Sequence, residues 1–180
     1  GYTVTEAKIS MAPGAHYLVT SDGKVVATGT SKFPDDPDTQ QADDEYHDTG
    51  LSGVSNVYTW KGNGGDKHAC AIMTDKTVRC WGKGNYGQLG DGCTITCSNY
   101  RTSVITPPVT DAVHMAIGEY HTIAVLSNGT VMTWGYNNQG QLGDGTNTWN
   151  SNPTLLQGIT NVKKAAAGCL LYTSPSPRDE

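Results

Sequence analysis

The chain has 180 residues, of which 36% are hydrophobic, and a formal net charge of −5. Its 22 glycines, single phenylalanine and lack of long 3.6-residue periodicity exclude a helical bundle and indicate an all-β chain with many tight turns. No stretch concentrates lysine and arginine and no apolar run reaches the roughly 20 residues of a membrane span, so we expect neither a nucleic-acid partner nor a membrane-spanning segment.

The first predicted hairpin covers residues 16–29. Its two β-rich runs flank Asp22-Gly23, a dipeptide that favours a tight turn because glycine accepts a positive φ. Two later segments repeat its pattern with one residue more, and Thr28 stands where both of them carry tryptophan. We interpret it as a degenerate first copy of a repeated unit.

An acidic segment follows over residues 33–48. Besides His47 it holds seven carboxylates that form a possible binding loop: Asp35, Asp36, Asp38, Asp43, Asp44, Glu45 and Asp48. Hard cations take several oxygen ligands, but Gln41 stands where an EF-hand loop needs glycine. We expect a solvated surface loop and no cofactor, with calcium binding or a basic partner as alternatives.

The second predicted hairpin, over residues 68–82, contains two cysteines. A three-residue loop, Thr74 to Lys76, would place Cys70 directly opposite Cys80, whereas a two-residue loop would pair Cys80 with Ala71. We predict the first register, which brings the two Cβ atoms close to the ~4 Å that a disulfide requires.

Two more cysteines, Cys93 and Cys97, lie a short step further on. The next copy of the unit lacks both members of each cysteine pair. Two cysteines that form a disulfide with each other are expected to be absent together in this way. Four cysteines allow three connectivities, and free thiols or a metal site are alternatives, although the spacing is not that of a zinc ribbon. Disulfides would indicate a secreted or cell-surface protein, and the sequon Asn128-Gly-Thr130 is compatible with one.

The third hairpin, over residues 121–135, repeats the second at an offset of 53 residues. The recurring residues, which we interpret as structural, are His68 and His121, Trp81 and Trp134, Gly82 and Gly135, Gln88 and Gln141, and Leu89 and Leu142. The tryptophans are expected to anchor a sheet core, the leucines to hold a glycine-rich turn, and the histidines to bond the backbone within each unit. Self-similarity at this spacing predicts a propeller or a solenoid.

The end of the chain combines two features. Residues 162–168 start a fourth copy, and residues 169–179 resemble the translated readthrough of a sequencing adapter. We therefore expect residues 169–180 to be a non-native tail, which removes Cys169 from the cysteine count.

The repeated units resemble those of the regulator of chromosome condensation family. The shared signature is a histidine, an apolar run, a hairpin turn, Val-x-x-Trp-Gly and then Asn-x-x-Gly-Gln-Leu-Gly-Asp-Gly, and it covers roughly residues 9–168. The resemblance implies an all-β partial β-propeller of about three four-stranded antiparallel blades, out of the seven that are typical of the family. The expected units lie near residues 9–60, 61–113 and 114–168, as part of a larger disc.

No residue pattern in the chain indicates catalysis. His68 and His121 recur with the repeat, whereas a catalytic histidine would be needed once, and no nucleophile or phosphate-loop motif is present. We expect a non-enzymatic protein-binding scaffold, a fragment of a larger extracellular or cell-surface protein, with the nucleus or cytoplasm as the alternative location. The alternative functions are nucleotide exchange on a small GTPase, which the resemblance implies, and the regulatory propeller of a larger enzyme.

Overall fold

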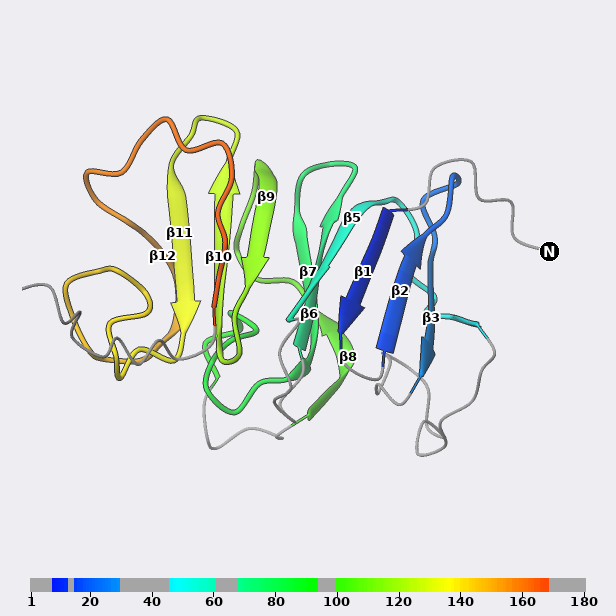
Figure 1. Ribbon diagram of the computed structural model, residues 1–180, viewed down its shortest axis with the longest axis horizontal. Helices are drawn as coiled ribbons and strands as arrows, with labels where there is room; N and C mark the ends of the chain where they lie inside the picture. Colours follow the sequence, from blue (N-terminus) through cyan, green and yellow to red (C-terminus); the bar gives the residue numbers. More distant parts are fainter. Residues whose placement is uncertain (1–7, 13–14, 30–45, 61–67, 94–99, 169–180) are drawn as a thin grey trace, which may run out of the picture.

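Three antiparallel sheets stand side by side in the computed structural model, which describes residues 8–12, 15–29, 46–60, 68–93 and 100–168 (Figure 1). The described strands are β1 Lys8–Ala12, β2 Ala15–Val19, β3 Val25–Gly29 and β4 His47–Asp48 in the first sheet, β5 Val54–Thr59, β6 His68–Met73, β7 Val78–Lys83 and β8 Tyr100–Ile105 in the second, and β9 Ala112–Ile117, β10 His121–Leu126, β11 Val131–Gly135 and β12 Asn150–Leu155 in the third. Strands that follow one another in the chain are neighbours in each sheet. The predicted all-β partial propeller of three four-stranded blades is confirmed.

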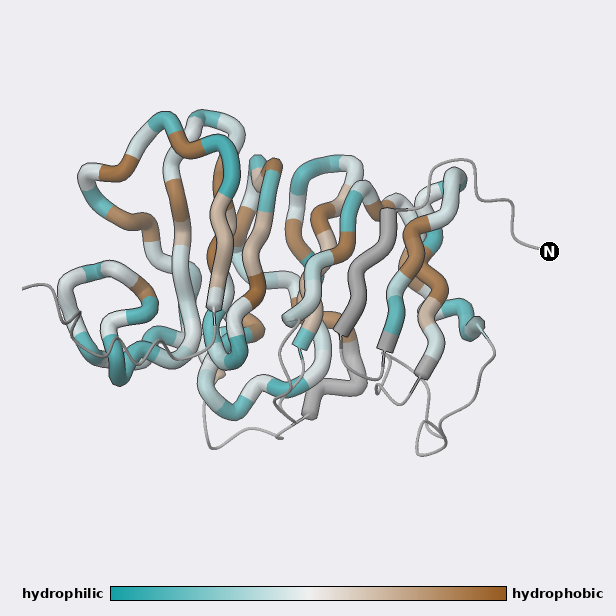
Figure 2. Tube along the Cα trace, in the orientation of Figure 1, coloured by the Kyte–Doolittle hydropathy of each residue, from teal (hydrophilic) through white to brown (hydrophobic). Residues whose placement is uncertain are grey.

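Hydropathy follows the strands and turns of the sheets. Figure 2 shows apolar residues concentrated in the strands and hydrophilic ones at many of the turns between them. In β6, five successive residues, His68 to Ile72, are buried, because the second sheet is covered by a neighbouring sheet on each face. β5 starts the second sheet at Val54, so the expected unit boundary near residue 60 falls after its first strand.

Each sheet has the same three-residue hairpin loop between its second and third strands. In the second sheet, the amide of Met73 donates to the carbonyl oxygen of Thr77 and the amide of Lys76 donates to that of Met73, both at 2.9 Å. The third loop residue has a positive φ in every case: 76° at Gly23, 65° at Lys76 and 81° at Gly129. The Asn128-Gly129 dipeptide therefore uses the left-handed region at its second residue alone, as part of a longer loop than a two-residue Asn-Gly turn.

A repeated backbone hydrogen bond joins each of these loops to the unit that follows. The amide of the first residue of the next unit donates to the carbonyl oxygen of the third loop residue, from Val54 to Gly23 at 2.9 Å, from Ala112 to Lys76 at 3.0 Å, and from Val162 to Gly129 at 3.0 Å. Val162 thus occupies the position that begins a sheet elsewhere, as expected of the start of a fourth copy. Residues 162–168 themselves form no strand.

The two recurring tryptophans fill the two spaces between sheets. Trp81, 1% exposed, packs with Tyr17 and Val19 of the first sheet, whereas Trp134, fully buried, packs with Cys70 and Leu89 of the second. Each tryptophan therefore lies between its own sheet and the preceding one. These equivalent surroundings confirm that the 53-residue recurrence marks successive blades of one propeller.

No helix able to cross a membrane occurs in the parts of the chain that the structure describes.

Candidate protein-binding site

The acidic segment of residues 33–48, which we predicted as a possible binding loop, lies largely outside the described residues. Of its seven carboxylates, Asp48 alone is described; it is exposed, and its Oδ1 accepts a hydrogen bond from the Gly50 amide at 2.9 Å. Within the described ranges, no group of three or more His, Cys, Asp and Glu residues is placed to hold a metal ion. Binding at the other six positions (Asp35, Asp36, Asp38, Asp43, Asp44 and Glu45) stays a prediction.

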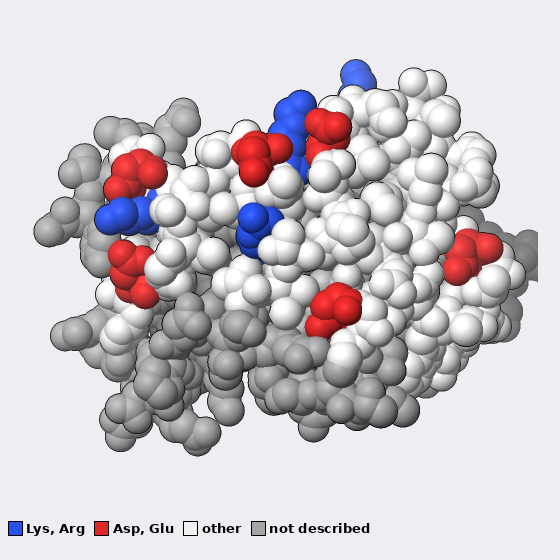
Figure 3. Space-filling model, turned by 180° about the vertical axis from the view of Figure 1, so that it is seen from behind, with Lys and Arg blue, Asp and Glu red and all other residues white. Residues whose placement is uncertain are grey.

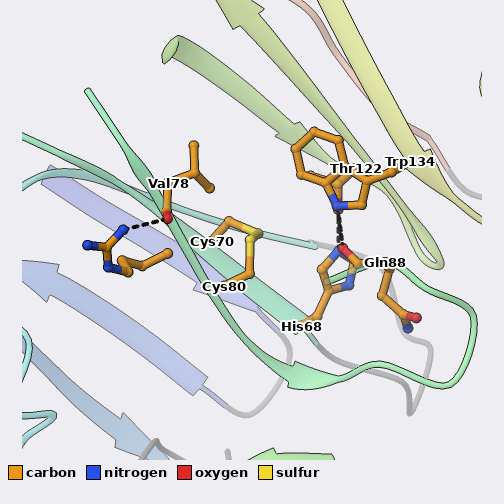
Figure 4. The surroundings of a disulfide bond; sticks show 8 residues. His68, Cys70, Val78, Cys80, Gln88, Thr122 and Trp134 are labelled. Carbon is orange, nitrogen blue, oxygen red and sulfur yellow. Dashed lines mark hydrogen bonds between the residues drawn. A yellow bond between two sulfur atoms is a disulfide. The ribbon is translucent and has the colours of Figure 1, made fainter. Parts of the chain in front are cut away.

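A disulfide joins Cys70 of β6 to Cys80 of β7 (Figure 4). The two residues are direct cross-strand partners, which confirms the register that the three-residue loop predicts. Their Cα atoms are 4.1 Å apart, a spacing near that of a non-hydrogen-bonded antiparallel pair, and both residues are fully buried between the second and third sheets. Cys93 is also disulfide-bonded, while Cys97 lies outside the described residues.

We expect loss of this cross-link to destabilise the chain. Because the two cysteines are 10 residues apart, the double substitution Cys70→Ala, Cys80→Ala should lower the free energy of unfolding by about 3 kcal/mol, measured by urea denaturation. A reducing agent should lower the urea midpoint of the parent more than that of the double variant, which retains the disulfide at Cys93. Equal sensitivity to reduction would contradict a stabilising role for the Cys70–Cys80 bond.

The buried His68 ring bonds to the neighbouring blade. Its Nε2 lies 2.9 Å from Thr122 Oγ1 of the third sheet, and that hydroxyl donates to the carbonyl oxygen of Gln88, which also accepts from Trp134 Nε1, each at 2.9 Å (Figure 4). Since the one hydroxyl proton of Thr122 goes to Gln88, His68 Nε2 must donate and its Nδ1 is unprotonated. The expected bond to backbone within the same unit is thus wrong for His68, whose ring couples two sheets.

Burial keeps both recurring histidines neutral. It lowers the pKa of His68 to about 3, with a smaller contribution from the nearby charge of His121, and it lowers the pKa of His121 to about 4. The His121 ring also packs directly on Gly118, where an added Cβ would lie 2.2 Å from a ring atom. Neither ring is placed for proton exchange with a solvent-borne substrate, because the two residues are only 3% and 7% exposed.

The other recurring residues hold the turns beyond the hairpins. Leu89 and Leu142 are buried, and the side-chain Oε1 atoms of Gln88 and Gln141 each accept the amide of the residue two positions earlier, at 2.9 and 2.8 Å. Gly135 has a φ of 111°, and a Cβ there would lie 2.4 Å from a backbone oxygen, so only glycine fits. These contacts account for the recurrence without a ligand.

Four aromatic rings meet where the loops of the second and third sheets come together. We name this group the aromatic cluster; it consists of Tyr86 after β7, Tyr120 between β9 and β10, Tyr136 after β11 and Trp149 before β12. Tyr86 lies 4.7, 5.3 and 5.2 Å from Tyr120, Tyr136 and Trp149 between ring centroids, and Tyr136 lies 5.0 Å from Trp149. All four residues are half-buried, so each keeps part of its surface in contact with solvent.

Backbone hydrogen bonds fix the loops that carry these rings. The amide of Tyr136 donates to the carbonyl oxygen of Tyr120 at 2.9 Å, and the amide of Gly92 donates across the junction to Ser151 at 3.0 Å. Trp149 Nε1 donates to the side-chain oxygen of Asn138. The rings are therefore held in place before any partner arrives, which lowers the entropic cost of binding.

The aromatic cluster does not follow the repeat. Between the second and third units, Tyr86 corresponds to Gln139 and Tyr136 to Lys83, and the other two rings correspond to Lys67 and Thr96. In the first unit, Tyr86 corresponds to Phe33. A blade can thus be built with polar side chains at these positions, and the propeller scaffold does not require the rings. The full set of four rings is therefore specific to the junction of the second and third sheets.

The ring distances also restrict what the aromatic cluster can bind. An aromatic cage for a quaternary ammonium ion needs facing rings around an open space, but these rings touch in edge-on and tilted pairs at 4.7–5.9 Å. They form a filled, part-exposed apolar surface. Surfaces of this kind, rich in Tyr and Trp, are typical of protein-binding hot spots.

The described residues on the face in Figure 3 form no charged patch that could serve as an alternative binding surface to the aromatic cluster. The acidic and basic side chains of the described residues are scattered over this face, and neither sign forms a continuous field. Among the described residues on this face, no basic patch of the extent that a nucleic-acid backbone requires is visible.

Repeated four-stranded sheets, identical hairpin loops and recurring bonds between sheets together define a β-propeller repeat protein. Family models named "Regulator of chromosome condensation (RCC1) repeat" match residues 77–125 and 128–170 in one form and residues 63–88 and 112–141 in another. The chain belongs to the regulator of chromosome condensation repeat family.

Curated relatives are similar to the chain over only a small part of their own length. The human E3 ubiquitin-protein ligase HERC2 is 36% identical over 111 residues, which cover 58% of this chain and 2% of the ligase. The ultraviolet-B receptor UVR8 of Arabidopsis thaliana is 30% identical over 111 residues, which cover 61% of this chain and 25% of the receptor.

Solved structures show the same fold at low sequence identity. The crystal structure of Kap60 bound to yeast RCC1 (Prp20) contains a chain that matches with a TM-score of 0.74 at 18% identity, covering 93% of this chain and 40% of that one. Human WBSCR16 matches with a TM-score of 0.69 at 21% identity, covering 89% of this chain and 42% of that one.

Proposed function

We propose that this chain is a non-enzymatic, protein-binding propeller module whose contact surface is the aromatic cluster. The observation that carries the proposal is the meeting of four half-buried rings, from loops of two sheets, where the corresponding residues of the second or third unit are polar. Aromatic side chains bury a large area at low conformational cost and carry much of the binding free energy at protein interfaces.

Solved structures of similar proteins favour a protein as the partner. One reports Kap60 bound to yeast RCC1 (Prp20), and another reports the binding properties of Prp20p from Saccharomyces cerevisiae to Gsp1p and histones. This binding is a property of those proteins, whose 16–18% identity to this chain supports the fold alone. Exchange activity on a GTPase is therefore an outcome for the binding experiment to detect.

The proposed location is extracellular or at the cell surface. The fully buried Cys70–Cys80 disulfide and the disulfide at Cys93 support it, because such bonds persist mainly in oxidising compartments. The nucleus or cytoplasm is the alternative, and it predicts that cysteines of the protein isolated from its own cells are reduced.

Alanine substitutions in the aromatic cluster test the proposed surface. Proteins captured by the parent chain should be lost with the double variant Tyr86→Ala, Trp149→Ala, since each ring is expected to contribute about 2 kcal/mol or a roughly 30-fold change in Kd. The captured protein is then purified, and its Kd is measured by calorimetry against both chains.

Tyr46→Ala supplies the matched control, because Tyr46 is an aromatic residue 50% exposed beside β4, on the first sheet. This variant should bind like the parent. Equal binding by the double variant and the parent would overturn the assignment of the surface, and accelerated nucleotide release from a captured GTPase would replace the scaffold function with exchange.

A further inference from the structure

We propose that Asn128, at the hairpin between β10 and β11, is an N-glycosylation site. Asn128-Gly129-Thr130 is the only Asn-x-Ser/Thr sequence in the chain whose middle residue is not proline. The other such triplet, Asn152-Pro153-Thr154, contains the proline that prevents modification.

The hairpin presents the Asn128 side chain in an accessible form. The residue is exposed, and its Oδ1 accepts hydrogen bonds from the Thr130 amide at 3.0 Å and from the Thr130 hydroxyl at 2.7 Å. These bonds use the oxygen and leave the amide nitrogen, to which a glycan is attached, without an acceptor among the described residues.

The fold does not itself require an amide at this position. In the second sheet the equivalent Asp75 accepts the same two bonds, from the Thr77 amide at 2.9 Å and the Thr77 hydroxyl at 2.6 Å. A side-chain oxygen is thus sufficient for the turn, and aspartate supplies it. The nitrogen of Asn128 is the feature that the structural role leaves unexplained.

A glycan on this hairpin would leave the aromatic cluster accessible. Tyr120 precedes the first residue of β10 and Tyr136 follows the last residue of β11, whereas Asn128 lies at the opposite ends of both strands. Six residues of strand separate those ends by about 20 Å. The turn also packs away from solvent on its other side, where Gly129 bonds to Val162, so a glycan would extend from the exposed side.

The inference rests on the oxidising compartment that the proposed location assigns, and it is independent of the aromatic cluster. Oligosaccharide transfer to asparagine occurs on secreted and cell-surface proteins, where stable disulfides also form. One chain that carries both a buried disulfide and an exposed sequon fits this compartment on two separate grounds.

The test uses the full chain isolated by antibody from its own source and treated with peptide-N-glycosidase F. We expect a fall in mass and conversion of Asn128 to aspartate, detected by peptide mass spectrometry. A native chain that is disulfide-bonded but has unmodified Asn128 would overturn the proposal while leaving the proposed binding surface intact.

Two variants expressed in a eukaryotic secretory host locate the modification. Asn128→Asp should abolish the mass change and fold like the parent, because Asp75 makes the same turn bonds. Asn152→Asp should retain the full mass change. A glycan that persists in Asn128→Asp would place the modification elsewhere and contradict the assignment.

Discussion

Replacing Trp134 with alanine is expected to lower the free energy of unfolding by about 3–5 kcal/mol, as for other buried aromatic residues. The ring is fully buried in the core between the second and third sheets, with Cys70, Leu89 and Met115 around it. Its removal leaves a cavity in the surface that holds two blades together. Urea denaturation followed by circular dichroism measures the loss.

Trp134→Phe is the matched control for this substitution. Phenylalanine keeps most of the ring volume and loses the Nε1 hydrogen bond to Gln88, whose carbonyl oxygen still accepts from Thr122. The expected cost is about 1–2 kcal/mol, from one hydrogen bond and a small loss of volume. An alanine variant as stable as the parent would contradict the packing of the third blade against the second.

Mild acid should destabilise the fold through the two buried histidines. The pKa of His68 is lowered to about 3 and that of His121 to about 4, so the unfolded chain binds protons more readily than the folded chain. Their stabilising contribution is complete above the unfolded pKa of about 6.5 and is lost as the pH falls below it. At pH 4.5, keeping each histidine neutral costs roughly 3 kcal/mol of stability, and the two together cost roughly 5 kcal/mol.

The aspartates contribute to the pH dependence of stability at lower pH than the two histidines do, so the two contributions can be measured separately. Hydrogen bonds from neighbouring threonines lower the pKa values of Asp22, Asp75 and Asp144 from 3.8, so any stability that they contribute is lost only as the pH falls below about 4. The interval from pH 6 to pH 4.5 therefore reports on His68 and His121.

Urea denaturation across this interval measures the histidine contribution. Stability should fall by roughly 3 kcal/mol per pH unit in the parent, and by half of that in His68→Gln, which retains one titrating ring and a donor for Thr122. Constant stability of the parent between pH 7.5 and pH 4.5 would show that the rings are accessible to protons in the folded chain.

Local sequence was sufficient to predict the hairpins and the disulfide register. The three-residue loop from Thr74 to Lys76 determines which residues face each other, so Cys70 opposite Cys80 follows from counting along two strands. The role of the tryptophans was predictable for a related reason, because a large apolar residue that recurs with the repeat has to be buried wherever the unit is built.

Contacts between sheets could not be predicted in this way. The partner of His68 is Thr122, which lies 54 residues away, and its place beside the ring depends on how two blades pack. Recurrence identified His68 as structural, but it gave no information about which residue the ring would contact.

The aromatic cluster could not be predicted from the recurring residues, because it is not part of the repeated pattern. Its rings come from three loops between residues 86 and 149, and Tyr86 alone has an aromatic counterpart at the 53-residue offset, Phe33 in the first unit. A tyrosine or tryptophan whose equivalent in the other copy of the repeat is polar is the sequence signal that could have revealed it, as Tyr86 and its equivalent Gln139 show. Residues that recur with the repeat are explained by the structure of the blade, so residues that differ between copies are the better candidates for a functional site.

Nuclear Overhauser spectroscopy of the full chain tests most directly whether adjacent blades assemble a binding surface at their junction. Tyr86 of the second sheet should give cross-peaks to the ring protons of both Tyr120 and Trp149, because the ring centroids are 4.7 and 5.2 Å apart. A folded chain in which the Tyr86 ring shows contacts to neither residue would contradict both the packing of the blades and the proposed site.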